Sequence, residues 1–220
     1  ETTASSGAVE GLRRTKDADE IAALRAAAAA GDAAFSSLSE IADRMSTEQQ
    51  VGWRLIDVMR AHGGEAASWE PIVAAGPAAS IPHYRAGKKP VVGGLLLLDY
   101  GCVVDGYHSD MTRTVWLEGE PDEEMARVYQ AVLESQQAGV AAVAPGVECG
   151  AVDEAVREVL RGYGYEKQFL HSTGHGGGLG IHEPPWVRRG NEDELRVGDV
   201  VTVEPGVYLP GIGGVRIEDM

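Results

Sequence analysis

The segment at residues 171–184 reads HSTGHGGGLGIHEP and places His171, His175 and His182 among many glycines. Imidazole rings bind divalent metals and exchange protons near neutral pH, and a packed core does not require them in such a segment. Glycines let the backbone pass close to a ligand because they have no side chain. The Gly-Lys-Ser/Thr ending of a phosphate-binding loop is missing, which disfavours a nucleotide site. Two interpretations stay open at this point: a loose turn, and a metal or substrate site.

Acidic residues stand at the ends of apolar segments, where an ionised carboxylate is costly unless it is paired or bound to a cation. Asp99 follows four leucines, and Glu204 closes the segment DVVTVE. Asp110 and Glu218 occur in SDMTRT and GGVRIED. Each of them alone is also compatible with a strand end that faces water, so a shared site requires that they converge.

A predicted β-hairpin brings two of these acids together. The segment LLLLDYGCVVDGYHSDMTRTVW has the turn residues of a hairpin centred on Asp105-Gly106. That turn places Asp99 opposite Thr112. Because side chains alternate along a strand, Asp110 lies on the same face as Asp99, diagonal to it, at roughly 7–8 Å between Cα atoms. Two ionised carboxylates this close repel each other, and a divalent cation between them would remove the repulsion.

The four acids and one histidine of the glycine-rich segment make a coherent ligand set. Carboxylate and imidazole ligands together suit Mn²⁺, Fe²⁺, Co²⁺ or Zn²⁺ better than Ca²⁺. Four carboxylates also balance the charge of two divalent cations, and two such ions roughly 3.5–4 Å apart are a recognised device for hydrolysis. We therefore predict a site for two divalent metal ions, with Mn²⁺ as the first choice.

The composition bounds the class of protein. The chain has 220 residues, 44% of them hydrophobic, which suits one large domain or two small ones. A formal net charge of -15 opposes binding to nucleic-acid phosphates, and no apolar stretch reaches the ~20 residues of a membrane span. The isolated cysteines, Cys102 and Cys149, are typical of a reducing compartment. We predict a cytoplasmic protein with no nucleic-acid or membrane partner.

Helix and strand signals follow a pattern that occurs twice along the chain: two helices and then strands. Asp17 and Glu20 form a capping box at the start of the first helix, and Thr47 caps the second. The predicted helices span residues 17–42, 47–62, 122–143 and 150–162. Since the strands cluster apart from the helices, the expected class is α+β rather than a doubly wound sheet.

Five motifs carry a resemblance to a known family: DYG at 99–101, SDMTRT at 109–114, TGHG at 173–176, EPGVY at 204–208 and VRIED at 215–219. In this order and spacing they resemble the pita-bread metallopeptidases, which include methionine aminopeptidase, Xaa-Pro aminopeptidase and prolidase. The resemblance runs from about Arg13 to the end of the chain. It implies the pita-bread fold, with two pseudo-symmetric α/β halves around a curved antiparallel sheet. It also implies the metal ligands Asp99, Asp110, His175, Glu204 and Glu218.

Further details resemble the proline-specific branch of that family. The segment IVAAGPAASIPHY is similar to the loop that carries a substrate-contacting histidine, which is His83 here. His182 follows His175 by seven residues and His171 precedes it by four, as in Xaa-Pro aminopeptidases. The resemblance therefore implies an Xaa-Pro aminopeptidase or dipeptidase in which His83, His171 and His182 face the reacting peptide.

Three other residues receive expected roles in that site. Glu204, a ligand beside the reacting oxygen, is the expected general base and proton carrier. Arg216 stands two residues before Glu218 on the same strand face, so we expect it to orient the carboxylates. Tyr208 is a further candidate for such support.

The resemblance also bears on domains and partners. Residues 1–15 are expected to be a loose segment, and residues 16–220 the catalytic domain. Proline-specific relatives carry an additional N-terminal domain, and they usually continue beyond the position of Met220. The expected partner is a peptide with proline at its second position, and a homo-oligomer is typical of the family. Two other functions remain open: a methionine aminopeptidase-like exopeptidase, and a non-catalytic binding module of the same fold.

Overall fold

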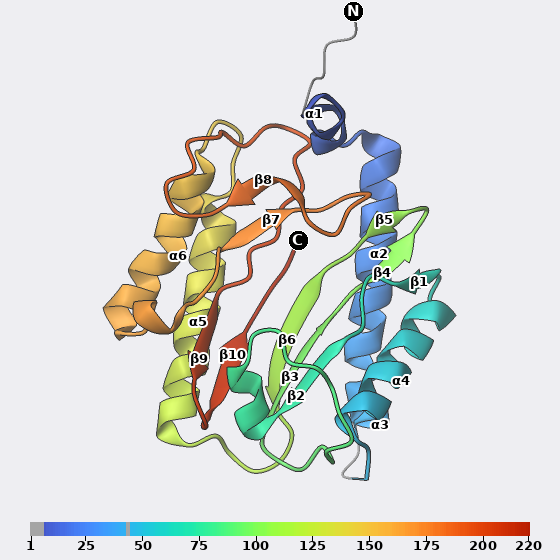
Figure 1. Ribbon diagram of the computed structural model, residues 1–220, viewed down its shortest axis with the longest axis vertical. Helices are drawn as coiled ribbons and strands as arrows, with labels where there is room; N and C mark the ends of the chain where they lie inside the picture. The colour runs from blue at the N-terminus through green and yellow to red at the C-terminus, as the bar shows by residue number, and fades with distance from the viewer. Residues whose placement is uncertain (1–6, 43–44) are drawn as a thin grey trace, which may run out of the picture.

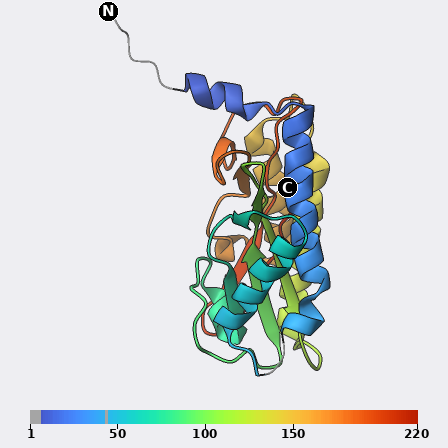
Figure 2. The ribbon, with the colours of Figure 1, turned by 90° about the vertical axis from the view of Figure 1, so that its right-hand side faces the viewer.

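The computed structural model describes residues 7–42 and 45–220. The long helices stand on either side of a central group of strands, with α2 (Ala18–Ser36) and α4 (Glu48–Ala61) on the right of Figure 1 and α5 (Glu123–Ala142) and α6 (Cys149–Tyr163) on its left. In the side view, α2 runs along one edge of the molecule, and loops lie along the opposite edge (Figure 2).

The first pair of helices begins where the capping residues predict. The Asp17 side chain accepts from the backbone N–H of Glu20, and the Glu20 side chain accepts from that of Asp17. Thr47 and Gln50 form the same reciprocal pair at α4. The single helix predicted for residues 17–42 is split, however, because Ser36 ends α2 and a short helix, α3 (Leu38–Ile41), follows.

The predicted hairpin is present in the predicted register. The strands β3 (Leu95–Tyr100) and β6 (Met111–Trp116) pair antiparallel, with Asp99 opposite Thr112. The turn residues Asp105 and Gly106 have φ angles of 50° and 81°, as a tight hairpin turn requires. The remaining strands of this half are β1 (Ala66–Ala67), β2 (Ile72–Ala75), β4 (Cys102–Val104) and β5 (Tyr107–His108), with a 3₁₀ turn η1 at Gly76–Ser80.

The second half repeats the order of two helices and then strands. The Asp122 carboxylate accepts from the Met125 N–H and caps α5. The strands that follow are β7 (Gly174–Gly176), β8 (Glu183–Val187), β9 (Gly206–Leu209) and β10 (Gly213–Arg216), after a 3₁₀ turn η2 at Glu166–Gln168. The doubled order predicted from the sequence is thus present.

Strand β3 lies between hydrophobic cores that belong to the two halves. Leu96 and Leu98 pack with residues of α2 and α4, whereas Leu95 and Leu97 pack with residues of α5 and α6. Burial on both faces explains the unbroken run of leucines, since a strand with one wet face would alternate with polar residues. Asp99 shares the face of Leu95 and Leu97, and it therefore points toward the second half.

Isolated bridges join the separate strand pairs into one antiparallel path. Glu218 pairs with Thr112, Asp219 pairs with Val203, and Gly176 pairs with Val201. The strand β3 pairs with β6, and β6 pairs with the segment at 218–219 that follows β10. That segment pairs with the segment at 201–203 that precedes β9, which in turn pairs with β7. Each of these neighbouring segments carries or adjoins one of the predicted metal ligands.

The beginning of the chain differs from the expected loose segment. Helix α1 (Ala8–Arg14) forms there, and Arg14 is buried against Asp199, with its Nη2 atom 2.7 Å from the carboxylate. Residues 1–6 lie outside the described residues. No helix in the described ranges is long and apolar enough to cross a membrane.

Candidate metal centre and substrate cavity

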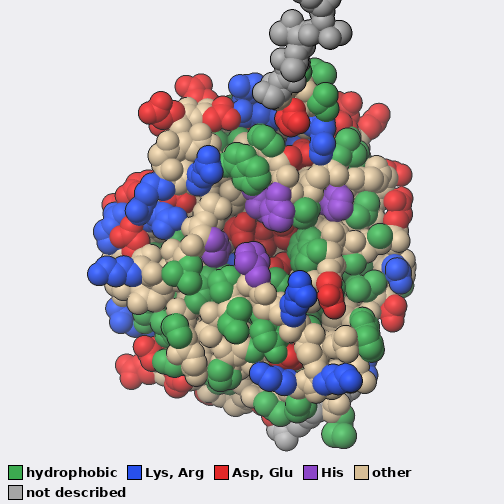
Figure 3. All heavy atoms as spheres, viewed as in Figure 1, with side chains coloured by type: hydrophobic (Ala, Val, Ile, Leu, Met, Phe, Trp, Pro, Cys, Tyr) green, Lys and Arg blue, Asp and Glu red, His purple; other side chains and the backbone are tan. Residues whose placement is uncertain are grey.

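A cavity of about 290 Å³ opens on the face of the molecule that Figure 3 shows. Figure 3 shows acidic side chains at the floor of this hollow and histidines around its rim. The lining includes all five predicted metal ligands and all three predicted substrate-contacting histidines. The lining residues are Trp69, Ile72, Pro82, His83, Asp99, Asp110, His171, Ser172, His175, Ile181, His182, Trp186, Glu204, Arg216 and Glu218.

Three of the five predicted ligands lie close together, and a fourth, Glu204, is next to them. Ligand atoms of Asp110, His175 and Glu218 all lie within 4.8 Å of one another, and all three residues are buried. The His175 Nε2 atom is 3.6 Å from Asp110 Oδ2 and 3.5 Å from Glu204 Oε1. The other ring nitrogen, Nδ1, is 3.0 Å from Gly176 O. A proton on Nδ1 that is donated to this carbonyl would leave Nε2 free to bind a metal.

Neighbouring segments hold these side chains in place. His175 lies in β7, where its N–H donates to Thr202 Oγ1 and its carbonyl accepts from the Thr202 N–H. The Glu204 N–H donates to Thr173 O at 2.8 Å. Glu218 follows β10 and donates its N–H to Thr112 O at 3.1 Å. Backbone hydrogen bonds thus fix the spacing of ligands that are far apart in sequence.

The electrostatics of the cluster favour a cation. Burial, and then the neighbouring carboxylates, raise the pKa of Asp110 and of Glu204 well above the usual range. Burial and the Asp99 charge raise the pKa of Glu218 to about 7. Among the described residues, Asp99 Oδ1 and Glu218 Oε1 are buried oxygens without a hydrogen-bond partner. Bound divalent cations would supply partners for these unpaired oxygens and would offset the repulsion between the carboxylates.

Arg216 and Thr112 support the acids from the side. Arg216 Nη2 donates to Asp99 Oδ2 at 2.5 Å, and Arg216 Nε donates to Thr112 Oγ1 at 3.1 Å. The Thr112 hydroxyl in turn donates to Glu218 Oε2 at 2.6 Å. Arg216 thus contacts Asp99 directly and reaches Glu218 only through Thr112. Sequence reasoning did not assign a role to Thr112, although its place opposite Asp99 in the hairpin was the available signal.

Tyr208 links Arg216 to His171. Its hydroxyl accepts from Arg216 Nη1 at 2.8 Å and lies 2.8 Å from His171 Nε2. The other ring nitrogen of His171 is 2.8 Å from Ser172 O, so Nδ1 carries the proton and the tyrosine hydroxyl donates to Nε2. Burial lowers the pKa of His171 to about 4, which agrees with a neutral ring.

The other two predicted histidines stand at the rim. The ring centroid of His182 is 4.3 Å from that of His175, and the two rings meet edge to face. His83 comes from the first half of the chain, shortly after η1, and lines the same cavity. Both are exposed, so a peptide in the cavity could reach them.

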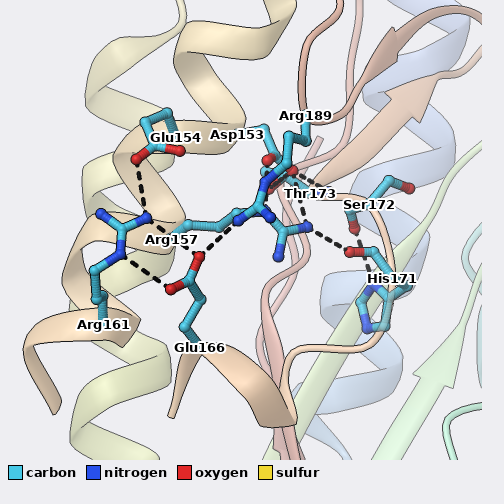
Figure 4. A network of polar contacts seen from close by, with 9 residues as sticks. All are labelled: Asp153, Glu154, Arg157, Arg161, Glu166, His171, Ser172, Thr173 and Arg189. Carbon is cyan, nitrogen blue, oxygen red and sulfur yellow. Dashed lines mark hydrogen bonds and ion pairs between the residues drawn. The ribbon is translucent and has the colours of Figure 1, made fainter. Parts of the chain in front are cut away.

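A buried ion pair on α6 holds the segment before β7 (Figure 4). The Asp153 carboxylate accepts from Arg157 Nε at 2.6 Å and from the Thr173 hydroxyl at 2.8 Å. Arg157 Nη2 donates to His171 O at 2.9 Å. Sequence reasoning missed this support, because an acid and an arginine four residues apart on a helix also occur on solvated faces.

The chain belongs to metallopeptidase family M24, whose family model matches residues 22–220. It is 37% identical over 212 residues to an Xaa-Pro dipeptidase of Pyrococcus furiosus, a match that covers 96% of this chain and 61% of that relative. The family predicted from five motifs is confirmed.

Solved structures give the same assignment. An Xaa-Pro dipeptidase from Bacillus anthracis superposes with a TM-score of 0.95 at 41% identity, covering 98% of this chain and 61% of that one. An X-Pro aminopeptidase from Thermotoga maritima gives 0.92 at 36% identity, covering 96% and 60%. The predicted pita-bread fold is confirmed. The chain spans about three fifths of the length of these proteins.

Proposed function

We propose that the chain is the catalytic part of a metal-dependent exopeptidase that hydrolyses Xaa-Pro bonds, as an Xaa-Pro aminopeptidase or dipeptidase. The observation that carries the proposal is the convergence of four buried or half-buried acids and His175 at the floor of one cavity. The printed names of the matched relatives support the choice of Xaa-Pro peptides. A cytoplasmic location and a homo-oligomer remain predictions.

We propose two divalent ions, with Mn²⁺ favoured over Co²⁺, Fe²⁺ and Zn²⁺. Asp99, Asp110, His175, Glu204 and Glu218 would hold them. Four ionised carboxylates match the charge of two such ions, and the unpaired oxygens of Asp99 and Glu218 are acceptors that need a cation. When bound, divalent ions would lower the pKa of water and polarise a peptide carbonyl.

Glu204 is the best placed of the four acids to carry a proton. Its side chain is 18% exposed, compared with 13% for Asp99 and 7% for Asp110. A carboxylate oxygen of Glu204 that faces the cavity would take a proton from the attacking water and give it to the leaving nitrogen.

The histidines of the cavity would bind the peptide, His83 and His182 directly and His171 through Tyr208. His83 and His182 would donate hydrogen bonds to the peptide backbone or to the developing oxyanion, a contribution of a few kcal/mol. His171 would act through Tyr208, whose hydroxyl it contacts. Arg216 would keep Asp99 oriented through their 2.5 Å contact.

Metal content and peptide hydrolysis test the proposal together. Purified protein would be loaded with Mn²⁺, assayed for bound metal, and given Ala-Pro, Ala-Pro-Ala and Met-Ala-Ser. We expect cleavage of one or both proline peptides and little cleavage of Met-Ala-Ser. Asp110→Asn should lose bound metal and at least about 10³-fold in kcat, whereas Asp105→Asn, the same change at the exposed turn of the same hairpin, should not.

Each contrary result has a clear meaning. Preferred cleavage of Met-Ala-Ser would identify a methionine aminopeptidase-like enzyme. Metal binding without hydrolysis of any of the three peptides would point to a binding module. Full turnover by the Asp110→Asn variant would overturn the site assignment itself.

A further inference from the structure

A buried ion pair lies beneath the loop that carries His182. The Lys16 ammonium is 2.7 Å from Glu183 Oε1, and the two side chains are 1% and 7% exposed. The other oxygen of Glu183 accepts from the Gly180 N–H at 3.2 Å and from Arg13 Nη2 at 2.6 Å. Both oxygens of Glu183 are therefore engaged by cationic side chains of the N-terminal segment, Oε1 by Lys16 and Oε2 by Arg13.

The loop at residues 177–182 is folded directly over this pair. A Cβ atom added at Gly178 would lie 2.4 Å from Glu183 Oε1 and 2.9 Å from the Cε atom of Lys16. Only a glycine lets the backbone approach so closely. The Gly178 carbonyl accepts from the His108 N–H at 2.9 Å. Backbone hydrogen bonds thus hold the start of the loop, and the Glu183 side chain holds its end.

His182 is the residue next to this support in the chain. Within the described part of the chain, the His182 ring has no hydrogen-bond partner, and its contact is the edge-to-face packing on His175. His182 directly precedes Glu183, the first residue of β8. The anchored Glu183 therefore fixes the end of the bend from which the His182 side chain reaches the cavity.

We propose that Lys16 and Glu183 are positioning residues that hold His182 over His175, and that they connect the N-terminal segment to the substrate cavity. The proposal rests on the substrate-binding role proposed above for His182. A buried pair suits this task because its attraction is strong where water is excluded and removal of one partner leaves an uncompensated charge.

The charge state of the pair agrees with such a task. Burial alone would raise the pKa of Glu183, but the hydrogen bond and charge of Lys16, together with the hydrogen bonds from Gly180 and Arg13, outweigh it, and the pKa lies below its usual value. Glu183 is therefore ionised near neutral pH and pairs with the Lys16 ammonium under the conditions of an assay.

Kinetics in two backgrounds test the coupling. Lys16→Met should lower kcat/KM for the cleaved proline peptide by about 10- to 100-fold, because a displacement of roughly 1 Å at a substrate-binding group has effects of that size. In the His182→Ala background the same change should lower kcat/KM by less than about 2-fold, since no ring is left to position. Equal factors in the two backgrounds would overturn the proposal.

Two further variants separate positioning from loss of folding. Glu183→Gln keeps the side-chain volume but leaves one acceptor oxygen in place of two, so either Lys16 or the Gly180 N–H loses its acceptor. The resulting loss in kcat/KM should again disappear without His182. Arg14→Met is the matched control, because Arg14 is as buried as Lys16 but pairs with Asp199 and not with the loop. It should lower stability and change kcat/KM by the same factor with and without His182.

An NMR measurement that does not depend on catalysis tests the positioning of His182 separately from the proposed peptidase activity. In ¹H–¹³C spectra of the metal-free protein, Lys16→Met should shift or broaden the His182 ring signals and leave those of the distant His62 unchanged. An unchanged His182 signal would overturn the positioning role. If the signal moves but the wild-type protein cleaves no Xaa-Pro peptide, the proposed function fails and the positioning role stands.

Discussion

At the scale of single residues, the Thr112 hydroxyl connects two of the acids, Glu218 and Asp99. Thr112 is fully buried, and its Oγ1 donates to Glu218 while it accepts from Arg216. The guanidinium of Arg216 in turn holds Asp99. The hydroxyl therefore fixes one predicted ligand directly and a second through an arginine, which is the kind of support that orients metal ligands.

We expect Thr112→Val to weaken metal binding by about 10- to 100-fold with little change in shape. Valine fills the same volume but leaves Glu218 Oε2 without its donor and Arg216 Nε without its acceptor. Titration with Mn²⁺ against a chelator measures the affinity. Thr112→Ser keeps the hydroxyl and should bind within a few-fold of the wild type. Wild-type affinity in the valine variant would contradict the role.

His171 should make the folded state sensitive to acid. Its pKa is about 4 in the fold because burial opposes the charged ring, compared with 6.5 for a free histidine. The unfolded chain therefore binds more protons in this window, and stability present above pH 6.5 is lost as the pH falls toward 4. Between about pH 7.5 and about pH 5 the loss amounts to about 2 kcal/mol.

Urea unfolding of the metal-free protein at several pH values measures this loss. The comparison is with His171→Gln, which has no ring to protonate but keeps a polar side chain near Tyr208. The stability difference between the two proteins should shrink by about 2 kcal/mol as the pH falls from about 7.5 to about 5. A difference that does not vary with pH would mean that folding does not lower the pKa of His171.

The residues that the sequence could identify are those with a local signal. Asp99 and Thr112 were placed opposite each other because a two-residue turn fixes the register of a hairpin, and the structure has that pairing. Lys16 and Asp153 carried no such signal. Their partners Glu183 and Thr173 are distant in the chain, and only tertiary packing brings them together.

At the scale of elements, α5 and α6 pack closely because one position on α5 has no side chain. A Cβ atom added at Gly139 would lie 2.6 Å from Val156 of α6 and 2.7 Å from Val203, the neighbour of Glu204. The glycine thus sets how near these helices and the ligand-bearing segment can approach. A helical glycine costs stability relative to alanine, and close packing offsets that cost here.

Gly139→Ala should therefore destabilise the fold by about 1–3 kcal/mol, even though alanine favours helices, since overpacking forces the neighbours to move. Gly162→Ala is the matched control: this glycine lies in α6 with no atom within 4 Å of an added Cβ, and the change should stabilise by about 0.5–1 kcal/mol. Thermal unfolding measures both. Stabilisation by both variants would show that the helices can separate without cost.

Element boundaries were predictable where a cap marks them and less so where side chains compete with the backbone. Asp17, Thr47 and Asp122 each begin a helix as expected. The end of α2 was missed because the Ser36 and Ser37 hydroxyls donate to carbonyls four residues back, which weakens a helix. Helix α1 was missed because its stability comes from distant ion pairs of Arg14.

At the scale of the whole molecule, the five predicted metal ligands lie at the boundary between the two halves of the fold. Asp99 and Asp110 come from the hairpin of the first half, and His175 and Glu204 come from the second. Without a cation, buried like charges on the two sides repel each other and raise each other's pKa. A ligand that binds all of them would join the halves and remove this repulsion.

Metal binding should therefore stabilise the entire fold and not one half of it. At a free Mn²⁺ concentration of about 100 times Kd, the gain is about 2.7 kcal/mol for each ion bound, or about 5–10 °C in Tm per ion for a chain of this size. Hydrogen exchange should slow both at Thr112 in the first half and at Thr202 in the second, because ligands on both sides become fixed. Asp110→Asn should lose the gain, and Asp105→Asn should keep it. Protection confined to one half would mean that the ions do not bind ligands from both halves. The five side chains would then not act as one site.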